Sequence, residues 1–303
     1  MSKKSENHLE DLKIRIRSID FLKILKEKFT YDQLSEKIDL PITVLNRYVK
    51  GHVIPSRERA EVLIDFFEKN IDLKEEILKK IHFNKWMENY QEYQKLIDDT
   101  RRIEKRIKNS INSVEISTLT QEIKFNNERI KDYLDKLKET RYIDNTQLLS
   151  DTLFLGVLAK FIAQKYKQST ITKILTAAVD GLPLAVRIAD QLEAELIIAK
   201  NTKEVGVPKY IEENYTPSSS SGNLLTLYVP RHLISKKDRV LIVDDIIRSG
   251  YTQNALIKIC KKINAKVLGV FIMIGFGTKW KEIFDNEEFK VETFLNIPDP
   301  MAL

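Results

Sequence analysis

The sequence predicts an α/β domain with a parallel sheet flanked by helices, preceded by an all-helical region. Two observations lead to this order. From Asp11 to about Trp86 the apolar residues recur at spacings of three and four, the period of helices that pack on one face. Beyond Asn112, short runs rich in β-branched residues alternate with helical patterns, which is typical of parallel strands connected by helices.

Length and composition indicate a folded chain. The 303 residues suffice for about two domains, and 43% hydrophobic with 31% charged residues is near the globular average. The single cysteine, Cys260, excludes an internal disulfide and is expected to be a buried structural thiol, and this usage favours a reducing compartment. Since no run of about 18 uncharged apolar residues occurs, neither a membrane span nor a secretion signal is predicted. We therefore expect a cytoplasmic protein.

Charge and histidine content exclude little. The net charge of +6 is compatible with nucleic-acid binding and also with a lysine-rich surface that has no special role. No carboxylate or cysteine lies at ligand spacing from any histidine, so neither a metal site nor a catalytic residue is assigned.

The helical region divides into a first domain, residues 1–82, and a helical connector, residues 83–112. The segment from Phe83 to Leu137 has long polar stretches with sparse Ile and Leu, which indicates one or more long exposed helices. Its basic run, Arg101 to Lys108, is either a solvated helix face or a connector that pairs with a second subunit or contacts phosphates. The apolar spacing is too irregular to predict a coiled coil.

Residues 31–51 contain two short helical patterns separated by Asp39-Leu40-Pro41. Pro41 stands where a helix can begin without losing a needed N–H, and Gly51 suits a left-handed cap at the end of the second helix. Two helices joined by so short a turn predict a helix-turn-helix, whose second helix fits a DNA major groove. The alternative is a plain helical hairpin used for packing or dimerisation.

This segment resembles the Cro/C1-repressor type of helix-turn-helix, and Gly51…Pro55-Ser56 with the following helix matches that pattern too. The resemblance implies a set of DNA-contacting residues, in which the first four face base edges and the last meets a phosphate: Ile42, Thr43, Asn46, Arg47 and Lys50. Arg47 would pair with guanine and Asn46 with adenine. Eleven basic and seven acidic residues between Asp11 and Arg59 give this module a net charge of +4.

Residues 113–303 are predicted to form the α/β domain. Five apolar, β-branched runs look like strands, namely 171–179, 195–199, 224–229, 239–244 and 266–274, and helical patterns at 182–192 and 252–263 lie between some of them. Runs that are apolar throughout predict strands buried on both faces of a parallel sheet.

The strand at 239–244 leads into two consecutive carboxylates, Asp244 and Asp245, ahead of a loop that opens a helix. Burying either one unpaired would cost several kcal/mol, whereas at the carboxyl end of a parallel strand both face the crevice where ligands bind. There they can accept hydrogen bonds from vicinal hydroxyls. The next residues, Ser249-Gly250-Tyr251-Thr252, supply hydroxyls, a glycine and helix N-terminal N–H groups that favour phosphate. Ribose 5-phosphate fits both halves.

The segment resembles the phosphoribosyl pyrophosphate (PRPP) motif of type I phosphoribosyltransferases, and the resemblance implies that fold for the α/β domain. It implies that Asp244 and Asp245 hold ribose hydroxyls and that five residues wrap the 5-phosphate: Arg248, Ser249, Gly250, Tyr251 and Thr252. Asp180 and Gly181 stand at the pyrophosphate loop. Lys200 and Lys203 lie where the family places basic residues before its mobile hood, and Mg²⁺ can accompany PRPP.

Two stretches refine the resemblance. Arg248 departs from the family, which has a small residue there or, in hypoxanthine-guanine enzymes, an aspartate that acts on the base; an arginine suits anion binding and removes a carboxylate base.

The stretch YTPSSSSG is similar to phosphoribosyltransferase-type purine repressors, with xanthine phosphoribosyltransferases as enzymatic relatives. Tyr215 is then expected to stack on a base and Ser219 and Ser220 to contact ligand, the alternative being a plain mobile loop.

A DNA-reading module ahead of a nucleotide-type domain predicts a transcription regulator whose affinity for double-stranded DNA depends on PRPP or a purine nucleotide. Helix-turn-helix proteins generally bind as symmetric dimers and phosphoribosyltransferase folds commonly pair, so a homodimer is expected. The alternative is a working purine phosphoribosyltransferase that uses Mg-PRPP, with the N-terminal helices serving assembly. Arg248 argues against that alternative.

Overall fold

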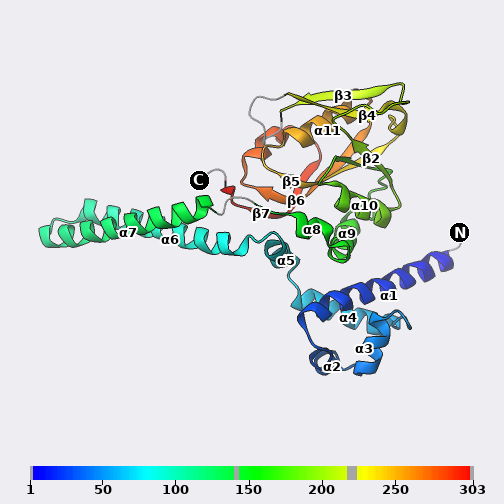
Figure 1. Cartoon of the computed structure of the whole chain (residues 1–303), viewed down its shortest axis with the longest axis horizontal. Coiled ribbons are helices and arrows are strands. Elements are labelled where there is room, and N and C mark those ends of the chain that lie inside the picture. The colour runs from blue at the N-terminus through cyan, green and yellow to red at the C-terminus, as the bar shows by residue number, and fades with distance from the viewer. Residues whose placement is uncertain (1–2, 140–142, 217–223, 301–303) are drawn as a thin grey trace.

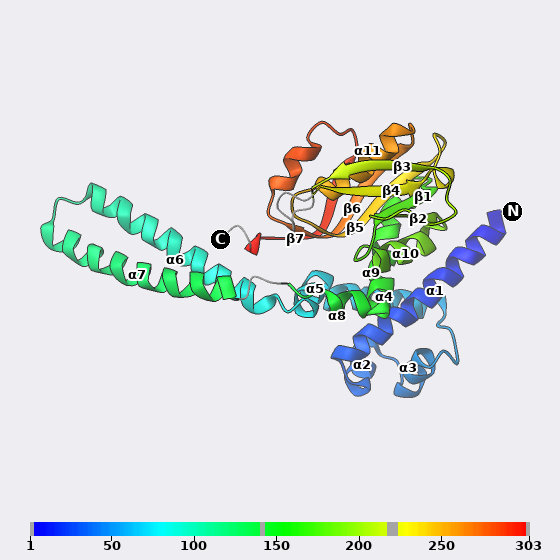
Figure 2. The ribbon, with the colours of Figure 1, turned by 45° about the horizontal axis from the view of Figure 1, so that its top comes forward.

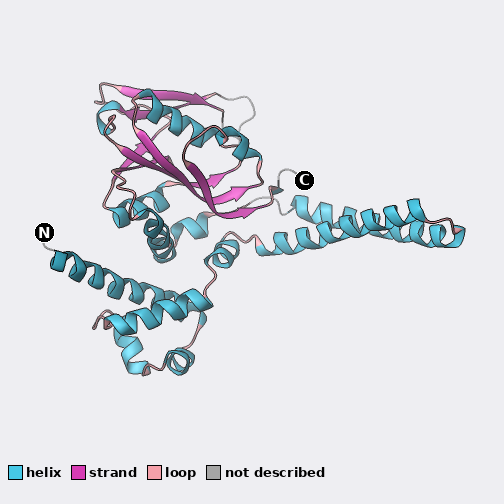
Figure 3. Ribbon diagram, turned by 180° about the vertical axis from the view of Figure 1, so that it is seen from behind, coloured by secondary structure: helices cyan, strands magenta, loops and turns pink. Residues whose placement is uncertain are grey.

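The computed structural model describes residues 3–139, 143–216 and 224–300, which form three parts (Figure 1). Helices α1 to α5 make an N-terminal part, α6 and α7 form an arm that projects to one side, and the α/β part follows. Within the described residues the strands all lie in the α/β part, as the view from behind shows (Figure 3). The prediction of an α/β domain preceded by an all-helical region is confirmed.

A parallel five-stranded sheet is the centre of the α/β part. Its strands, in spatial order, are β2 (Glu195–Ala199), β1 (Lys173–Ala177), β5 (Arg239–Ile247), β6 (Lys266–Phe276) and β7 (Lys290–Ile297). Successive side chains of a strand point to opposite faces, so Leu241 and Val243 pack on one side of β5 while Val240 and Ile242 pack on the other. Both faces are therefore buried, as the apolar runs predict.

Helices cover the two faces of this sheet. α9 (Thr152–Tyr166) and α10 (Leu182–Leu192) lie on one face and α11 (Tyr251–Lys262) on the other, with the short α8 (Thr146–Ser150) ahead of α9. Two 3-10 turns, η1 (Arg231–Leu233) and η2 (Lys279–Phe284), complete the connections. Since α10 follows β1 and α11 follows β5, both helices begin at the carboxyl edge of the sheet.

A separate antiparallel pair of strands, β3 (Tyr210–Tyr215) and β4 (Leu225–Pro230), lies beside the edge strand β2. The predicted strand at 224–229 is therefore present as β4, but its expected place in the parallel sheet is wrong. β3 and β7 are strands that the apolar pattern missed. Polar residues interrupt both of them, because each strand has a face or an edge toward solvent.

The N-terminal part contains α2 (Tyr31–Ile38) and α3 (Ile42–Val49) joined by a three-residue turn and packed against α1 (Lys3–Lys28) and α4 (Arg57–Asn70). α5 (Leu73–Lys80) follows α4 and contacts α8. Thr30 and Gln33 form a capping box at the start of α2. Pro41 directly precedes α3, and Gly51 has a φ of 72°, in the left-handed region that the sequence predicts for it. The rings of Phe21 and Phe67 stack at 4.3 Å and join α1 to α4.

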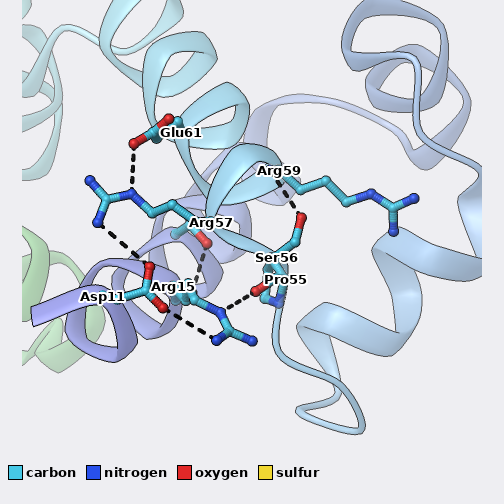
Figure 4. A network of polar contacts seen from close by, with 8 residues as sticks. Asp11, Arg15, Pro55, Ser56, Arg57, Arg59 and Glu61 are labelled. Carbon is cyan, nitrogen blue, oxygen red and sulfur yellow. Dashed lines mark hydrogen bonds and ion pairs between the residues drawn. The ribbon is translucent and has the colours of Figure 1, made fainter. Parts of the chain in front are cut away.

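Polar contacts hold the start of α4 against α1 (Figure 4). Arg15 donates from Nε to the carbonyl oxygen of Pro55 at 2.6 Å and pairs with Asp11 at 3.4 Å. Arg57 pairs with Glu61 at 2.6 Å and with Asp11 at 3.7 Å. Because Pro55 lies two residues before α4 and Arg57 is its first residue, these contacts tie the start of α4 to α1.

The arm is an antiparallel hairpin of α6 (Asn84–Asn109) and α7 (Ser113–Glu139) (Figure 2). At its base the indole of Trp86 stacks between the rings of Phe83 and Tyr90 and donates to the carbonyl oxygen of Leu137 at 3.2 Å. The predicted connector, 83–112, contains α6, and α7 follows it and packs back on α6. Neither arm helix, nor any other helix in the described residues, is long and apolar enough to span a membrane.

The N-terminal part packs directly on the α/β part. Lys13 of α1 pairs with Glu193 after α10 at 2.8 Å, and Arg17 donates to the Gln164 side chain of α9 at 2.9 Å. Buried apolar residues of both parts, from Phe21 on α1 to Leu155 on α9, belong to one continuous cluster. The two parts therefore share a core, so a shift in one can be felt in the other.

Candidate functional site

The candidate ligand site lies at the carboxyl edge of the sheet, where β1 and β5 are neighbours. Asp180 and Gly181 follow β1 and lead into α10, while Asp244 and Asp245 lie in the last half of β5. The fold therefore brings together two segments that are far apart in the sequence. Ligands of open parallel sheets bind at such an edge.

Asp244 and Asp245 are both buried, with exposed fractions of 6% and 7%. The Gln253 side chain of α11 donates to Oδ2 of Asp244 at 2.7 Å, and the backbone N–H of Asp245 donates to Oδ1 of Asp244 at 3.1 Å. Burial raises the pKa of Asp244 well above its ordinary range, and the charge of Asp245 raises it further. Burial also raises the pKa of Asp245, with the charge of Asp180 adding to the effect. The oxygens of the pair can accept hydrogen bonds from hydroxyls or cationic groups.

The turn after β1 approaches Asp244 closely. A Cβ built on Gly181 would lie 2.5 Å from Oδ1 of Asp244 and 2.5 Å from Oγ1 of Thr176, so a glycine is required there. Asp180 is exposed beside it, and the peptide bond between Ala178 and Val179 is cis. Since Gly181 touches Asp244, the carboxylate pair and this turn form one surface.

The loop from Arg248 to Gly250 connects β5 to α11. Gly250 directly precedes the helix with a φ of 82°, and a Cβ on it would lie 2.9 Å from the ring of Phe284. A side chain is therefore excluded on both grounds. Ser249 and Thr252 are half-buried, and Tyr251 is half exposed. Backbone N–H groups and hydroxyls gather at this helix start, which is the arrangement that anions prefer.

The Arg248 side chain in that loop pairs with a residue that follows β7. Its Nε lies 3.3 Å from Oδ1 of Asp299, beyond β7, and its guanidinium stands 4.9 Å from the ring centre of Phe276. The guanidinium of Arg248 would therefore have to leave Asp299 before it could contact a ligand phosphate, as the sequence predicts.

The two hood lysines pair with acidic residues. Lys200 bonds to Glu204, and Lys203 lies 3.1 Å from Glu212 and 4.9 Å from the ring centre of Tyr228. Tyr215 accepts a hydrogen bond at its hydroxyl from the Asn201 side chain at 3.3 Å. The structure thus places all three in the β3–β4 region, away from direct contact with the carboxylate pair. Ser219 and Ser220 lie outside the described residues.

Asn145 is a site residue that the sequence reasoning missed. Its Nδ2 donates to Oδ2 of Asp245 at 3.0 Å, across 100 positions of sequence. It lies in the short segment ahead of α8, which is half-buried at this point. The sole local signal is an Asp-Asn-Thr helix start, and such starts are too common to indicate a site.

A second candidate site is the outer face of α3, at the end of the N-terminal part farthest from the sheet (Figure 1). Leu45 and Tyr48 are buried and anchor the helix, and Arg59 of α4 donates to the Tyr48 hydroxyl at 3.1 Å. The predicted contact residues lie on the opposite side: Ile42, Thr43, Arg47 and Lys50 are exposed, and Asn46 is half-buried. The outer face is therefore free to meet a large partner.

Within the described ranges, no group of three or more histidine, cysteine, aspartate or glutamate side chains is arranged to hold a metal ion.

Comparison with known proteins identifies the second half of the chain. The family described as "Phosphoribosyl transferase domain" matches residues 144–296, about half of the chain. A curated relative, the probable purine biosynthesis transcriptional regulator PurR of Streptococcus pneumoniae, is 25% identical over 176 residues, which are 56% of this chain and 62% of the relative. The xanthine phosphoribosyltransferase of Streptococcus pyogenes is 32% identical over 124 residues, which are 41% of this chain and 64% of the enzyme.

The match thus spans less than two thirds of the length of these relatives. Among solved structures, adenine phosphoribosyltransferase from Thermoanaerobacter pseudethanolicus is similar with a TM-score of 0.47 and 14% identity, over 54% of this chain and 99% of that one.

Proposed function

Because the chain belongs to the phosphoribosyl transferase domain family, we propose that its α/β part binds PRPP or a purine nucleotide. We further propose that the protein is a DNA-binding transcription regulator. The observation that carries this proposal is the outer face of α3, where Thr43, Arg47 and Lys50 are exposed on a helix anchored by buried residues behind it. A hairpin used only for packing would bury such a face. The similarity to a purine transcriptional regulator supports the same function.

On the effector side, Asp244 and Asp245 would accept hydrogen bonds from the ribose hydroxyls. The loop from Arg248 to Thr252 would hold the 5-phosphate at the start of α11, and Asp180 with Gly181 would line the pyrophosphate. Mg²⁺ that accompanies PRPP would offset part of the negative charge of Asp180, Asp244 and Asp245. Lys200, Lys203 and Tyr215 would join the site only after their present bonds in the β3–β4 region exchange for ligand.

On the DNA side, α3 would enter the major groove. Arg47 would reach the O6 and N7 atoms of guanine, Asn46 would pair with adenine, and Lys50 would contact a phosphate. Ile42 and Thr43 would contribute apolar contacts to base edges. A homodimer would present two such helices to a two-fold symmetric operator. We propose DNA-reading, arm and ligand-binding units at 1–82, 83–139 and 143–303, in a cytoplasmic protein.

DNA binding is tested by fluorescence anisotropy with a labelled fragment from upstream of the protein's own gene. Since one bidentate guanine contact is worth about 1–3 kcal/mol, Arg47→Ala is expected to weaken binding by about 5- to 150-fold. Arg129→Ala removes the same group from the arm helix α7 and is the matched control, with unchanged affinity expected. No binding by the wild type, or equal binding by Arg47→Ala, would contradict the proposal.

A second function, a working purine phosphoribosyltransferase, is favoured by the carboxylate pair together with Asp180 and by the similarity to xanthine phosphoribosyltransferase. A mixture of purine bases with PRPP and Mg²⁺ distinguishes the two functions. Release of pyrophosphate would support the enzyme, whereas PRPP binding without pyrophosphate release would support the regulator. Arg248 favours the regulator, because the arginine leaves no carboxylate at position 248 to act on the base.

A further inference from the structure

We infer that Asn145 senses occupancy of the Asp244–Asp245 site and passes it to the N-terminal part through α8 and the ion pair between Asp151 and Lys80. This inference rests on the proposed effector binding and adds the route by which the ligand acts. The route begins at the carboxylate pair, follows the chain from Asn145 to Asp151, and crosses to α5 through the ion pair with Lys80.

The first contact is at the site itself. The amide of Asn145 donates to Oδ2 of Asp245 at 3.0 Å, and Asp245 is 7% exposed, so this bond lies in a mostly dry environment. Hydrogen bonds to buried carboxylates are stronger than average. A ribose hydroxyl that binds Asp245 competes for the same carboxylate. Ligand binding therefore replaces the bond from Asn145 and releases the chain ahead of α8.

The second step is α8, which transmits that release because it is short and held at both ends. Asp144 accepts hydrogen bonds from Thr146 at its start, and Leu148 is fully buried in the core that the two parts share. Asp151 ends α8 and also caps α9, where its Oδ1 accepts from the backbone N–H of Phe154 at 2.9 Å. With a rise of about 1.5 Å per helical residue, Asn145 and Asp151 are roughly 9 Å apart along the chain.

The third step crosses to the N-terminal part. Nζ of Lys80 lies 2.6 Å from Oδ2 of Asp151, with exposed side-chain fractions of 16% and 22%, and 5.4 Å from the ring centre of Phe154. Lys80 is the last residue of α5, whose Ile77 is fully buried. A shift of α8 therefore changes a largely shielded ion pair, which salt screens less than a surface pair. Since α5 follows α4 directly, the change reaches the unit that contains α3.

The neighbouring lysine provides a matched control. Lys79 is also on α5 and also pairs with carboxylates, Glu75 at 2.6 Å and Glu76 at 3.4 Å, but both partners are on its own helix. Removing the charge of Lys79 also breaks ion pairs of α5, but it leaves every contact with α8 and α9 in place. A general effect of weakening α5 would appear in both lysine variants, whereas transmission from α8 requires Lys80 alone.

The test uses the full chain, with PRPP and Mg²⁺ as the probe. Calorimetry gives the Kd for PRPP, and hydrogen exchange of α5 and α8 peptides, with and without PRPP, reports transmission without any need for DNA. In the wild type, PRPP is expected to speed exchange in both α8 and α5. Asn145→Leu loses the competing donor, so PRPP is expected to bind about fivefold more tightly and to change α5 exchange no further.

Lys80→Gln is expected to bind PRPP with wild-type affinity and to show the response in α8 but not in α5, while Lys79→Gln behaves as the wild type in both helices. Circular dichroism melting confirms that each variant is folded. If PRPP binds but α8 exchange is unchanged in the wild type, or Asn145→Leu responds as the wild type does, this inference is overturned while effector binding stands. If no heat of PRPP binding is seen in the wild type, this inference and the proposed binding of PRPP both fail.

Discussion

Replacing Asp245 with asparagine is expected to stabilise the ligand-free protein while it weakens ligand binding. In the wild type, Asp244 and Asp245 are adjacent and almost fully buried, and the charge of Asp245 disfavours ionisation of Asp244 while the charge of Asp180 disfavours ionisation of Asp245. An amide at position 245 keeps an oxygen to accept the bond from Asn145, and its NH2 group can donate to Asp244. The substitution thus exchanges a repulsion for a hydrogen bond.

The pH dependence follows from the direction in which burial moves the two pKa values. Both carboxyls have native pKa values raised above their unfolded values, so between those values the native state binds more protons than the unfolded state. Wild-type stability therefore falls as the pH rises through this window, and the full penalty is present above the raised pKa values. A tenfold change in proton affinity corresponds to about 1.4 kcal/mol. We expect Asp245→Asn to raise the free energy of unfolding by about 1–3 kcal/mol at neutral pH.

Thermal unfolding of wild type and variant at neutral and mildly acidic pH measures the effect. Since 1 kcal/mol shifts the Tm of a domain of this size by about 2–4 °C, the variant is expected to melt several degrees higher at neutral pH, and the gain is expected to shrink on acidification. Asp238→Asn is the control, and it is expected to lower the Tm at neutral pH, opposite to Asp245→Asn. Burial alone would raise the pKa of Asp238, but hydrogen bonds from Ser235 and Thr172 outweigh it and lower the pKa. A variant at 245 that melts below the wild type at neutral pH would refute the reasoning.

Three further expectations come from single positions. Gly181→Ala places a methyl group 2.5 Å from Oδ1 of Asp244, so PRPP binding by calorimetry should be lost; an unchanged Kd would count against the described turn. Burial raises the pKa of Cys260 to about 12, so a thiol reagent should label the chain only after denaturation, and rapid labelling of native protein would contradict this. Trp86→Ala removes a stacked, hydrogen-bonded ring and should cost about 3–5 kcal/mol, seen as faster proteolysis of the arm; an intact arm would argue otherwise.

The sequence was sufficient to predict that the aspartate pair lies at the carboxyl edge of the sheet, because the signal there is local. Asp244 and Asp245 come at the end of an apolar strand, and Gly250 precedes a helix, so chemistry and position coincide within a few residues. The signal for the two short helices in residues 31–51 is equally local, since Pro41 and Gly51 mark the boundaries of α3. The structure confirms these elements, while the ligands of both sites stay predictions.

Features that depend on long-range contacts were not predictable. β3 and β7 carry Glu212 and Glu292 within the strand because part of each strand faces solvent, so no continuous apolar run marks them. Few residues of α7 are buried in the hairpin, so its pairing with α6 leaves only a sparse pattern. Asn145 meets Asp245 through the fold alone, and no pattern near residue 145 indicates that contact.

The hood lysines show a different kind of difference between motif and structure. The family pattern places Lys200 and Lys203 near a ligand, and both lie in the expected region, yet each is paired with a glutamate. A motif records which side chains can reach a site, whereas the bonds they make without ligand depend on nearby acidic residues that the motif does not include. Arg248 and Asp299 illustrate the same point on the other side of the site.

The central claim is that an occupied carboxylate pair changes the affinity of α3 for DNA. It is tested most directly by titrating the labelled DNA fragment with wild type and Asp245→Asn, each with and without saturating Mg-PRPP. Coupling of typical size, about 1–3 kcal/mol, predicts that PRPP changes the wild-type Kd for DNA by about 5- to 150-fold. Asp245→Asn should bind DNA as the ligand-free wild type does and ignore PRPP. A wild-type Kd for DNA that is the same with and without bound PRPP would contradict the claim.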